Sequence, residues 1–274
     1  MPQSLDRRQL LRRLGLGLAA VPLVKLAAAC TTDDAVGIGP DAATGGDAGT
    51  TTDGWASGGT AAMTAKASYP TDPFTASTAC VLVASTTEGP CTTATDVDRE
   101  DLSEGWGGIP VRLMLKVVDT SCNPIAGATV KIWHTNLEGV YSGQTPNPGM
   151  CSGNDQTAIS ANWMRGVQTT DDNGVVAFDT CFPGWYRGRA VHVHFQVKNG
   201  STSYRVSQLF FPEEITTAIF ASHVDYKGFG QPDTTFANDN ILSPITGDAR
   251  ARLVLDVARM TDGAMLASKV VTVR

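Results

Sequence analysis

Short segments in which apolar and polar residues alternate constrain the fold of this chain most strongly. Between Val111 and Val117, every second residue is a valine or a leucine, and a β-strand places alternate side chains on the same face. Turn sequences such as Asp171–Gly174 separate further short segments of this kind. Many short strands at this spacing predict an all-β protein, a sandwich or a barrel. The later strand segments are 128–133, 175–178, 191–197, 204–211, 252–257 and 265–273.

Length and composition narrow the class of protein. A chain of 274 residues can form one large all-β domain or two smaller ones. Charged residues make up 18% of the chain and the net charge is −6. This balance describes a soluble core and gives no electrostatic reason to expect a nucleic-acid partner. One short helix is expected at Pro212–Ser222, with proline at its start, followed by a long loop at 223–240.

The first thirty residues resemble a twin-arginine export signal. Arg7 and Arg8 precede an apolar run from Leu14 to Ala29, which is short for a membrane span. The run ends in Leu-Ala-Ala-Ala before Cys30, a pattern similar to a bacterial lipoprotein cleavage site. We therefore expect an exported chain in the periplasm or on the cell surface, held to the membrane only by a lipid on Cys30. The alternative is a plain signal peptide cut near Ala29.

Residues 31–72 are expected to form a disordered tether, and residues 73–274 a single β-sandwich domain. Thr, Gly, Ala and Asp dominate the first of these ranges, so it has too little apolar surface to offset the entropy of ordering. After Cys30 the chain has five cysteines, and export to an oxidising compartment favours disulfides. An odd number leaves at least one thiol without a partner in the chain, and the pairing stays open. The five are Cys80, Cys91, Cys122, Cys151 and Cys181.

Two of the four histidines stand two residues apart in a predicted strand. His192 and His194 therefore point to the same face, and two imidazoles on one face can bind a metal. The alternative is a pair of ordinary half-buried strand histidines. Tyr186 precedes the pair by six residues, and Tyr141 follows an earlier predicted strand. Phenolate is a hard anionic donor, so a set of two tyrosines and two histidines favours a ferric ion.

Five segments between Thr87 and Pro212 resemble the intradiol ring-cleaving dioxygenases, and Asn238-Asp239 fits a further element of that family. The resemblance runs in the same order along the chain, from about Thr87 to Leu255. The spacing of Arg189, His192 and His194 is its most specific part. The five segments are Thr87-Glu-Gly-Pro90, Ile132–Asn136 with Gly139–Tyr141, Arg165–Asp171, Phe182–Phe195 and Gln208–Pro212.

The resemblance implies a β-sandwich with long active-site loops and one non-haem Fe(III) per chain. Its ligands would be Tyr141, Tyr186, His192 and His194, the axial pair being Tyr186 and His192. A small aromatic diol of the catechol type and O2 would be the substrates, and a cis,cis-muconate-type diacid the product. The resemblance also implies that Arg189 and Gln208 line the diol pocket and that Tyr186 takes part in catalysis. His134 and His223 are expected to be structural.

Some features depart from the family pattern. Cys91 follows Thr87–Pro90 where an aromatic residue is more usual, and Cys181 precedes Phe182. The chain has no helical dimerisation segment before the sandwich, so it is nearer to protocatechuate-type members. Two alternatives remain: an exported binding or adhesion lipoprotein that has lost catalysis, and a copper or zinc enzyme with the same ligands. The sequence leaves the diol and the oligomeric state open.

Overall fold

The computed structural model describes residues 54–75, 79–95 and 97–274. All of them belong to the second of two units into which the chain divides, residues 46–274. The predicted export signal, Cys30 and the first part of the predicted tether lie outside the described residues.

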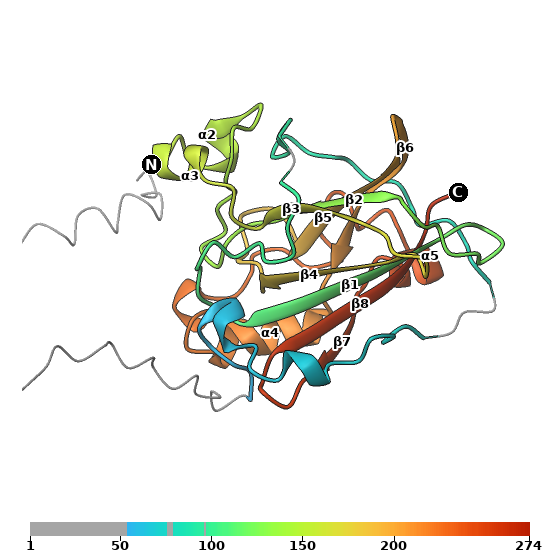
Figure 1. The fold of residues 1–274 in the computed structure, drawn as a ribbon. Coiled ribbons are helices and arrows are strands. Elements are labelled where there is room, and N and C mark those ends of the chain that lie inside the picture. The colour runs from blue at the N-terminus through green and yellow to red at the C-terminus, as the bar shows by residue number, and fades with distance from the viewer. Residues whose placement is uncertain (1–53, 76–78, 96) are drawn as a thin grey trace, which may run out of the picture. The chain divides into compact units, whose positions relative to one another are not determined.

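Two four-stranded sheets form the framework (Figure 1). All pairs of neighbouring strands are antiparallel except β1 and β8, which run parallel. The first sheet has the order β4 (Val175–Cys181), β1 (Pro110–Val118), β8 (Met265–Thr272) and β7 (Asp256–Arg259). The second has the order β3 (Arg165–Thr169), β2 (Thr129–Trp133), β5 (His192–Asn199) and β6 (Thr202–Phe210). The predicted all-β sandwich is confirmed.

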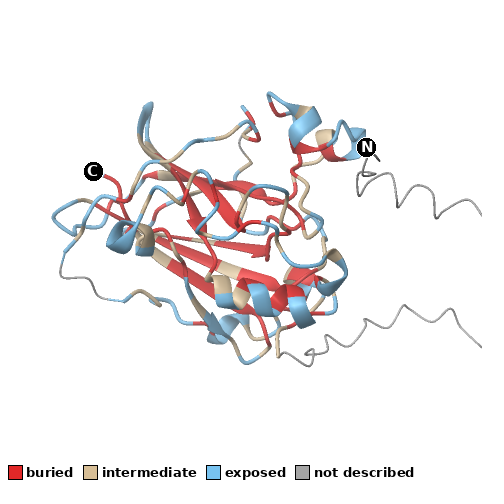
Figure 2. Cartoon of the chain, turned by 180° about the vertical axis from the view of Figure 1, so that it is seen from behind, coloured by how far each residue is buried: buried red, intermediate tan, exposed pale blue. Residues whose placement is uncertain are grey.

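The core lies between the sheets and follows the alternation in the sequence. The alternate valines and leucines of β1 from Val111 to Val117 are at most 1% exposed, as are Val193 and Phe195 on β5. Both strands contribute to one apolar cluster. Burying each such side chain stabilises the fold by roughly 1.5–3 kcal/mol. Figure 2 shows buried residues along the strands of both sheets and exposed residues on the helices.

The helices are short and lie outside the sheets. The predicted helix is confirmed as α4 (Glu213–Ser222), with Pro212 at its N-cap and two glutamates in its first turn, where negative charge is favourable. None of the helices in the described ranges is long and apolar enough to cross a membrane. The others are η1 (Gly59–Ala62), η2 (Lys66–Ser68), α2 (Pro148–Cys151), α3 (Gln156–Ser160), η3 (Lys227–Phe229) and α5 (Gly247–Ala251).

The strand predicted at 252–257 begins later than expected. Residues 247–251 form α5, and the last strand but one, β7, begins at Asp256. The predicted pairing of this strand with the final one is confirmed, since β7 and β8 are antiparallel neighbours. The short helix was missed because its sequence, Gly-Asp-Ala-Arg-Ala, is too short for a helical period to emerge.

The predicted tether boundary at residue 72 is wrong for the part that the structure describes. From residue 54 onward the chain packs against the domain: Ala56 N donates to Gly263 O at 2.8 Å, and Ala56 and Ala62 are almost fully buried. Ala65 N and Tyr69 Oη both donate to Asp262 Oδ2, at 2.8 and 2.6 Å. Small residues approach the sheet closely here, so a composition that suggested disorder instead permits packing.

Four of the five cysteines form two disulfides, Cys80–Cys122 and Cys91–Cys151. The fifth, Cys181, is a buried free thiol. The expectation that an odd thiol is left over is therefore confirmed. The second disulfide lies beside Trp133 and Tyr141, so it joins two loops next to the predicted metal ligands.

Candidate metal centre

Strand β5 places the two histidines of the site. His192 and His194 are 3% exposed, while Val193, between them, turns into the core and is 1% exposed. Neighbouring strands set what lies beside each ring, because cross-strand partners point to the same face. His194 has Trp133 of β2 on one side and Gln208 of β6 on the other. The two imidazoles therefore share one buried face, as predicted.

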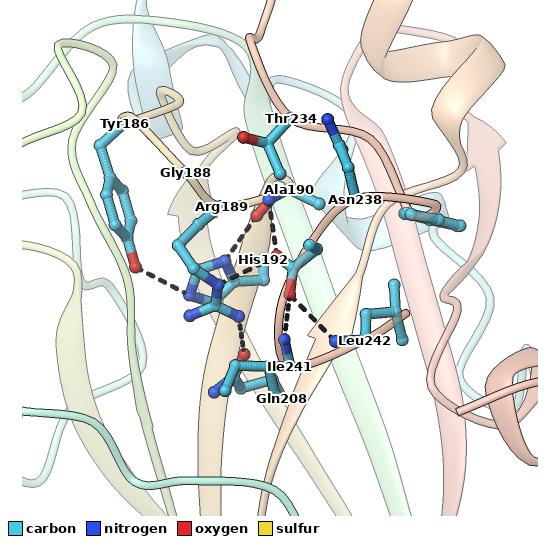
Figure 3. A network of polar contacts seen from close by, with 12 residues as sticks. Tyr186, Gly188, Arg189, Ala190, His192, Gln208, Thr234, Asn238, Ile241 and Leu242 are labelled. Atoms are coloured by element: carbon cyan, nitrogen blue, oxygen red, sulfur yellow. Dashed lines mark hydrogen bonds and ion pairs between the residues drawn. The ribbon is translucent and has the colours of Figure 1, made fainter. Parts of the chain in front are cut away.

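Two loops bring the tyrosines to the same place. Tyr141 follows β2 and is 2% exposed, and Tyr186 precedes β5 and is partly exposed. The phenol oxygens of both lie 3.4 Å from His192 Nε2, and His194 Nε2 lies 3.1 Å from the same atom. Figure 3 shows the Tyr186 hydroxyl pointing at His192. The four predicted ligand atoms thus converge, although they come from separate parts of the chain.

The hydrogen bonds of His192 orient its ring for a metal. Its Nδ1 lies 2.6 Å from Ala190 O, a carbonyl that can only accept, so Nδ1 carries the proton and Nε2 presents a lone pair in the neutral ring. Fixing a histidine in this way is typical of metal ligands. His194 stacks on Trp133 with centroids 4.9 Å apart, and its Nδ1 has no hydrogen-bond partner.

Burial controls the protonation of all four side chains. It lowers the pKa of His192 to about 3, with the positive charge of Arg189 acting in the same direction, and lowers the pKa of His194 well below its usual value. It raises the pKa of Tyr186, and that of Tyr141 well above the usual value. At neutral pH both imidazoles are therefore neutral and both phenols protonated. A bound cation would favour loss of the phenol protons.

The donor set fits a hard cation. In the described part of the chain, no three His, Cys, Asp or Glu side chains gather into a metal-binding group. The two tyrosines are therefore needed to bring the number of donor atoms to four. Two neutral imidazoles and two ionisable phenols suit Fe(III) better than Cu(I), which prefers sulfur ligands.

A charged network fixes Arg189 beside the four donors. Arg189 Nε donates to Asp239 Oδ2 at 2.9 Å, and its Nη2 donates to Gln208 Oε1 (Figure 3). Ala190 N donates to the same Asp239 oxygen at 2.8 Å. Burial acts to raise the pKa of Asp239, but the Arg189 charge and backbone N–H groups lower it below its usual value. The guanidinium is therefore held by an ionised carboxylate and an amide.

Sequence reasoning gave no role to several residues that shape this site. Asp239, fully buried, was noted only as part of a family element. The Thr87–Pro90 segment closes over His194: a Cβ on Gly89, which has a φ of +73°, would lie 3.2 Å from His194 Cε1. Thr87 O also accepts from Gln208 Nε2 at 3.0 Å. The glycine in this segment was the one signal of such a close approach.

The other two histidines are buried outside this set. His134 Nδ1 lies 2.8 Å from Thr135 O, and its Nε2 lies 2.8 Å from Thr180 Oγ1. Burial lowers the pKa of His134 to about 4. Both nitrogens are thus engaged, which fits the structural role expected for this residue. His223 is fully buried and is the C-cap residue of α4.

Comparison with known proteins gives the following matches. A family model described as Dioxygenase matches residues 87–271. An intradiol ring-cleavage dioxygenase from Tetranychus urticae is similar, with 25% identity, a TM-score of 0.62, and coverage of 71% of this chain and 95% of that one. A second dioxygenase crystal structure has 26% identity, a TM-score of 0.63 and the same coverage. The comparison with curated proteins returned no match.

Proposed function

Because the chain belongs to the intradiol ring-cleavage dioxygenase family, we propose that it cleaves the ring of a catechol-type diol with O2. The cut falls between the two hydroxylated carbons and gives a cis,cis-muconate-type diacid. One observation carries the proposal: His194 Nε2 and the two phenol oxygens lie 3.1–3.4 Å from His192 Nε2.

One non-haem Fe(III) per chain is the metal that suits this donor set. Tyr141, Tyr186, His192 and His194 are the residues that would hold it. When bound, the ferric ion supplies Lewis acidity that stabilises the deprotonated diol. The tautomer of His192, set by Ala190 O, keeps its Nε2 free to bind the ion.

The chain's own residues orient the diol and stabilise charge. Tyr186 and Arg189 are less buried than Tyr141 and the two histidines, so the diol approaches from their side. If Tyr186 loses its phenol proton in the presence of a bound cation, its Oη would be a phenolate that can take a proton from a diol hydroxyl. Arg189, fixed by Asp239 and Gln208, presents a preorganised positive charge to the ring as negative charge develops on it.

The test compares wild type with Arg189→Leu, both loaded with iron. Catechol and protocatechuate are supplied, and oxygen uptake, ring-opened product and iron content are measured. Loss of a preorganised donor of this kind lowers turnover by about 10²–10³-fold. Iron content is expected to stay near one per chain in the variant, because the guanidinium is not one of the four proposed metal-binding groups.

Two results would contradict the proposal. Active wild-type protein that carries zinc or copper would show that the proposal of iron as the metal is wrong. Wild type that holds ferric iron and binds catechols, yet consumes no oxygen with any diol, would favour a binding module that has lost catalysis.

We also propose that the protein is exported by the twin-arginine route and anchored by a lipid on Cys30. The proposal rests on the sequence of the first thirty residues. The two disulfides support it, since such bonds persist in oxidising compartments outside the cytoplasm. Cys30→Ser is expected to move the protein from the membrane fraction to a soluble exported fraction. Unchanged fractionation of this variant would contradict the proposal that a lipid on Cys30 anchors the protein.

A further inference from the structure

Arg165, the first residue of β3, is buried beneath the candidate metal centre. It pairs in register with Trp133 and is 3% exposed. Its Nε donates to Ser142 O at 2.8 Å and its Nη2 donates to Cys91 O at 2.7 Å. Ser142 directly follows Tyr141, and Cys91 directly follows the Thr87–Pro90 segment that closes over His194. One guanidinium therefore holds the two loops that flank the site.

The same two loops are also joined covalently. Tyr141 N donates to Cys151 O at 3.0 Å, and Cys151 is disulfide-bonded to Cys91. The disulfide fixes the separation of the loops, while the guanidinium sets the direction of the two carbonyls that follow Tyr141 and Pro90. Arg165 is thus the side-chain hydrogen-bond donor shared by both loops.

The positive charge of Arg165 has no carboxylate partner in the part of the chain that the structure describes. Among the described residues none of the salt bridges involves it, and its Nη1 has no hydrogen-bond partner. A guanidinium keeps its proton in proteins, so Arg165 is charged. Burying a charge without a counter-charge costs several kcal/mol, and such a charge needs an explanation.

Tyr141 is the group that could supply a counter-charge to Arg165. The guanidinium carbon lies 5.9 Å from the centroid of the Tyr141 ring. As a neutral phenol this ring offers only its π face. As a metal-bound phenolate it would bring one negative charge to a place where one positive charge is already buried.

We infer that Arg165 is a positioning residue for Tyr141, one that fixes the loop carrying this ligand and balances the charge of its phenolate. The inference rests on the proposed function, because it requires Tyr141 to bind the metal. It distinguishes the two tyrosines: Tyr186 lies on the side of Arg189 and the diol, whereas Tyr141 is backed by a cation from within the protein.

The experiment uses the iron-loaded protein and the variants Arg165→Met and Arg165→Lys. Iron affinity is measured by competition with a chelator, and the tyrosinate-to-iron absorption band by visible spectroscopy. Loss of groups that support metal ligands typically costs about 10–100-fold in affinity, which is expected for Arg165→Met. Its band should also move to longer wavelength, because a nearby cation opposes transfer of electron density away from the phenolate.

The Lys variant separates charge from hydrogen bonding. It keeps the charge but cannot donate in a fixed plane to both carbonyls, so its band should stay near the wild-type position while iron affinity falls less than in the Met variant. Arg112→Met is the matched control, because Arg112 is a largely buried guanidinium paired with Asp179 and Glu100. It should lower the melting temperature and leave the band unchanged.

Three outcomes decide the matter. A shifted band in Arg165→Met, restored in Arg165→Lys, supports the inference. An unshifted band and wild-type iron affinity in folded Arg165→Met overturn it and leave Arg165 as a cross-link between loops. If Arg165→Met does not fold, Arg165→Lys decides the matter alone. A band that moves in this variant to longer wavelength, as expected for loss of the positive charge, also overturns the inference. Wild type that binds no iron would instead refute the proposed function.

Discussion

A charged cluster at one sheet is partly exposed and the candidate metal centre on the other sheet is more deeply buried, and the two balance their polar groups differently. In the cluster, Lys66 and Arg112 face Glu100 and Asp179, with Lys66 Nζ 2.6 Å from Glu100 Oε1 and Arg112 Nη1 2.8 Å from Asp179 Oδ1. Each cation contacts both carboxylates. The cluster is therefore neutralised by groups of the chain itself.

The donor atoms of the candidate metal centre belong to side chains that burial keeps neutral. His192 Nε2 presents a lone pair to His194 Nε2 and to two phenol oxygens. The nearby Arg165 has no carboxylate partner within the described ranges. An added cation would bind the lone pairs and permit a phenolate beside Arg165. The comparison separates two uses of polar groups: the charge-balanced cluster is suited to stability, and the neutral donor set is suited to binding a cation.

The strongest way to break this comparison is His194→Ala. The substitution removes one of the four donors and also a buried nitrogen without a partner, so the chain should still fold. Iron affinity is expected to fall by more than about 100-fold, beyond the effect of altering a supporting residue. Metal analysis and the visible band measure this result. Full iron occupancy in the variant would show that His194 is not a ligand.

Asp179→Asn tests the other region and should show the opposite pattern. Asp179 is 4% exposed. Removal of its negative charge leaves Lys66 and Arg112 with Glu100 as their only carboxylate partner in the cluster. Breaking a buried pair costs about 3 kcal/mol, to be measured by urea unfolding of the metal-free protein. Iron content and turnover of the folded variant should stay at the wild-type level. A large loss of iron without a loss of stability would remove the distinction between the two regions.

The sequence was sufficient for the parts of the molecule that depend on local patterns. Alternation at Val111–Val117 predicted a core strand, and the spacing of His192 and His194 predicted their shared face. Tyr186 stands six residues before His192, so the sequence also predicted that it lies near this pair. In each case the signal is a period or a short separation, which backbone geometry converts directly into a position in space.

Partners distant along the chain could not be predicted in the same way. Arg165 is hydrogen-bonded to Cys91, 74 residues away in the sequence, and Arg189 to Asp239, 50 residues away. Neither pair has a local sequence pattern that predicts the contact. The tether boundary failed for a related reason: Ala56 and Tyr69 gain their contacts from the turn at Asp262 and Gly263, near the other end of the chain. Composition alone carries no information on such contacts.

The smallest expected effect is a pH dependence that belongs to the cluster alone. The hydrogen bond from Lys66 lowers the pKa of Glu100 from 4.5 to about 2, against the opposing effect of burial, with Arg112 acting in the same direction as Lys66. A lowered folded-state pKa contributes stability that is fully present above pH 4.5 and is lost as the pH falls toward 2. Because the Glu100 side chain is 47% exposed, solvent screening limits the contribution to about 1 kcal/mol.

The measurement compares the free energy of unfolding of metal-free wild type and Glu100→Gln at pH 6 and at pH 2.5. The amide cannot be ionised, so the variant should be less stable than wild type at pH 6, and the difference should shrink at pH 2.5. Acid effects on other carboxylates are common to both proteins and cancel in this difference. A difference that is the same at both pH values would show that Lys66 and Arg112 are not balanced by an ionised Glu100. The cluster would then depend on Asp179 alone for its negative charge, and its contrast with the candidate metal centre would be weaker.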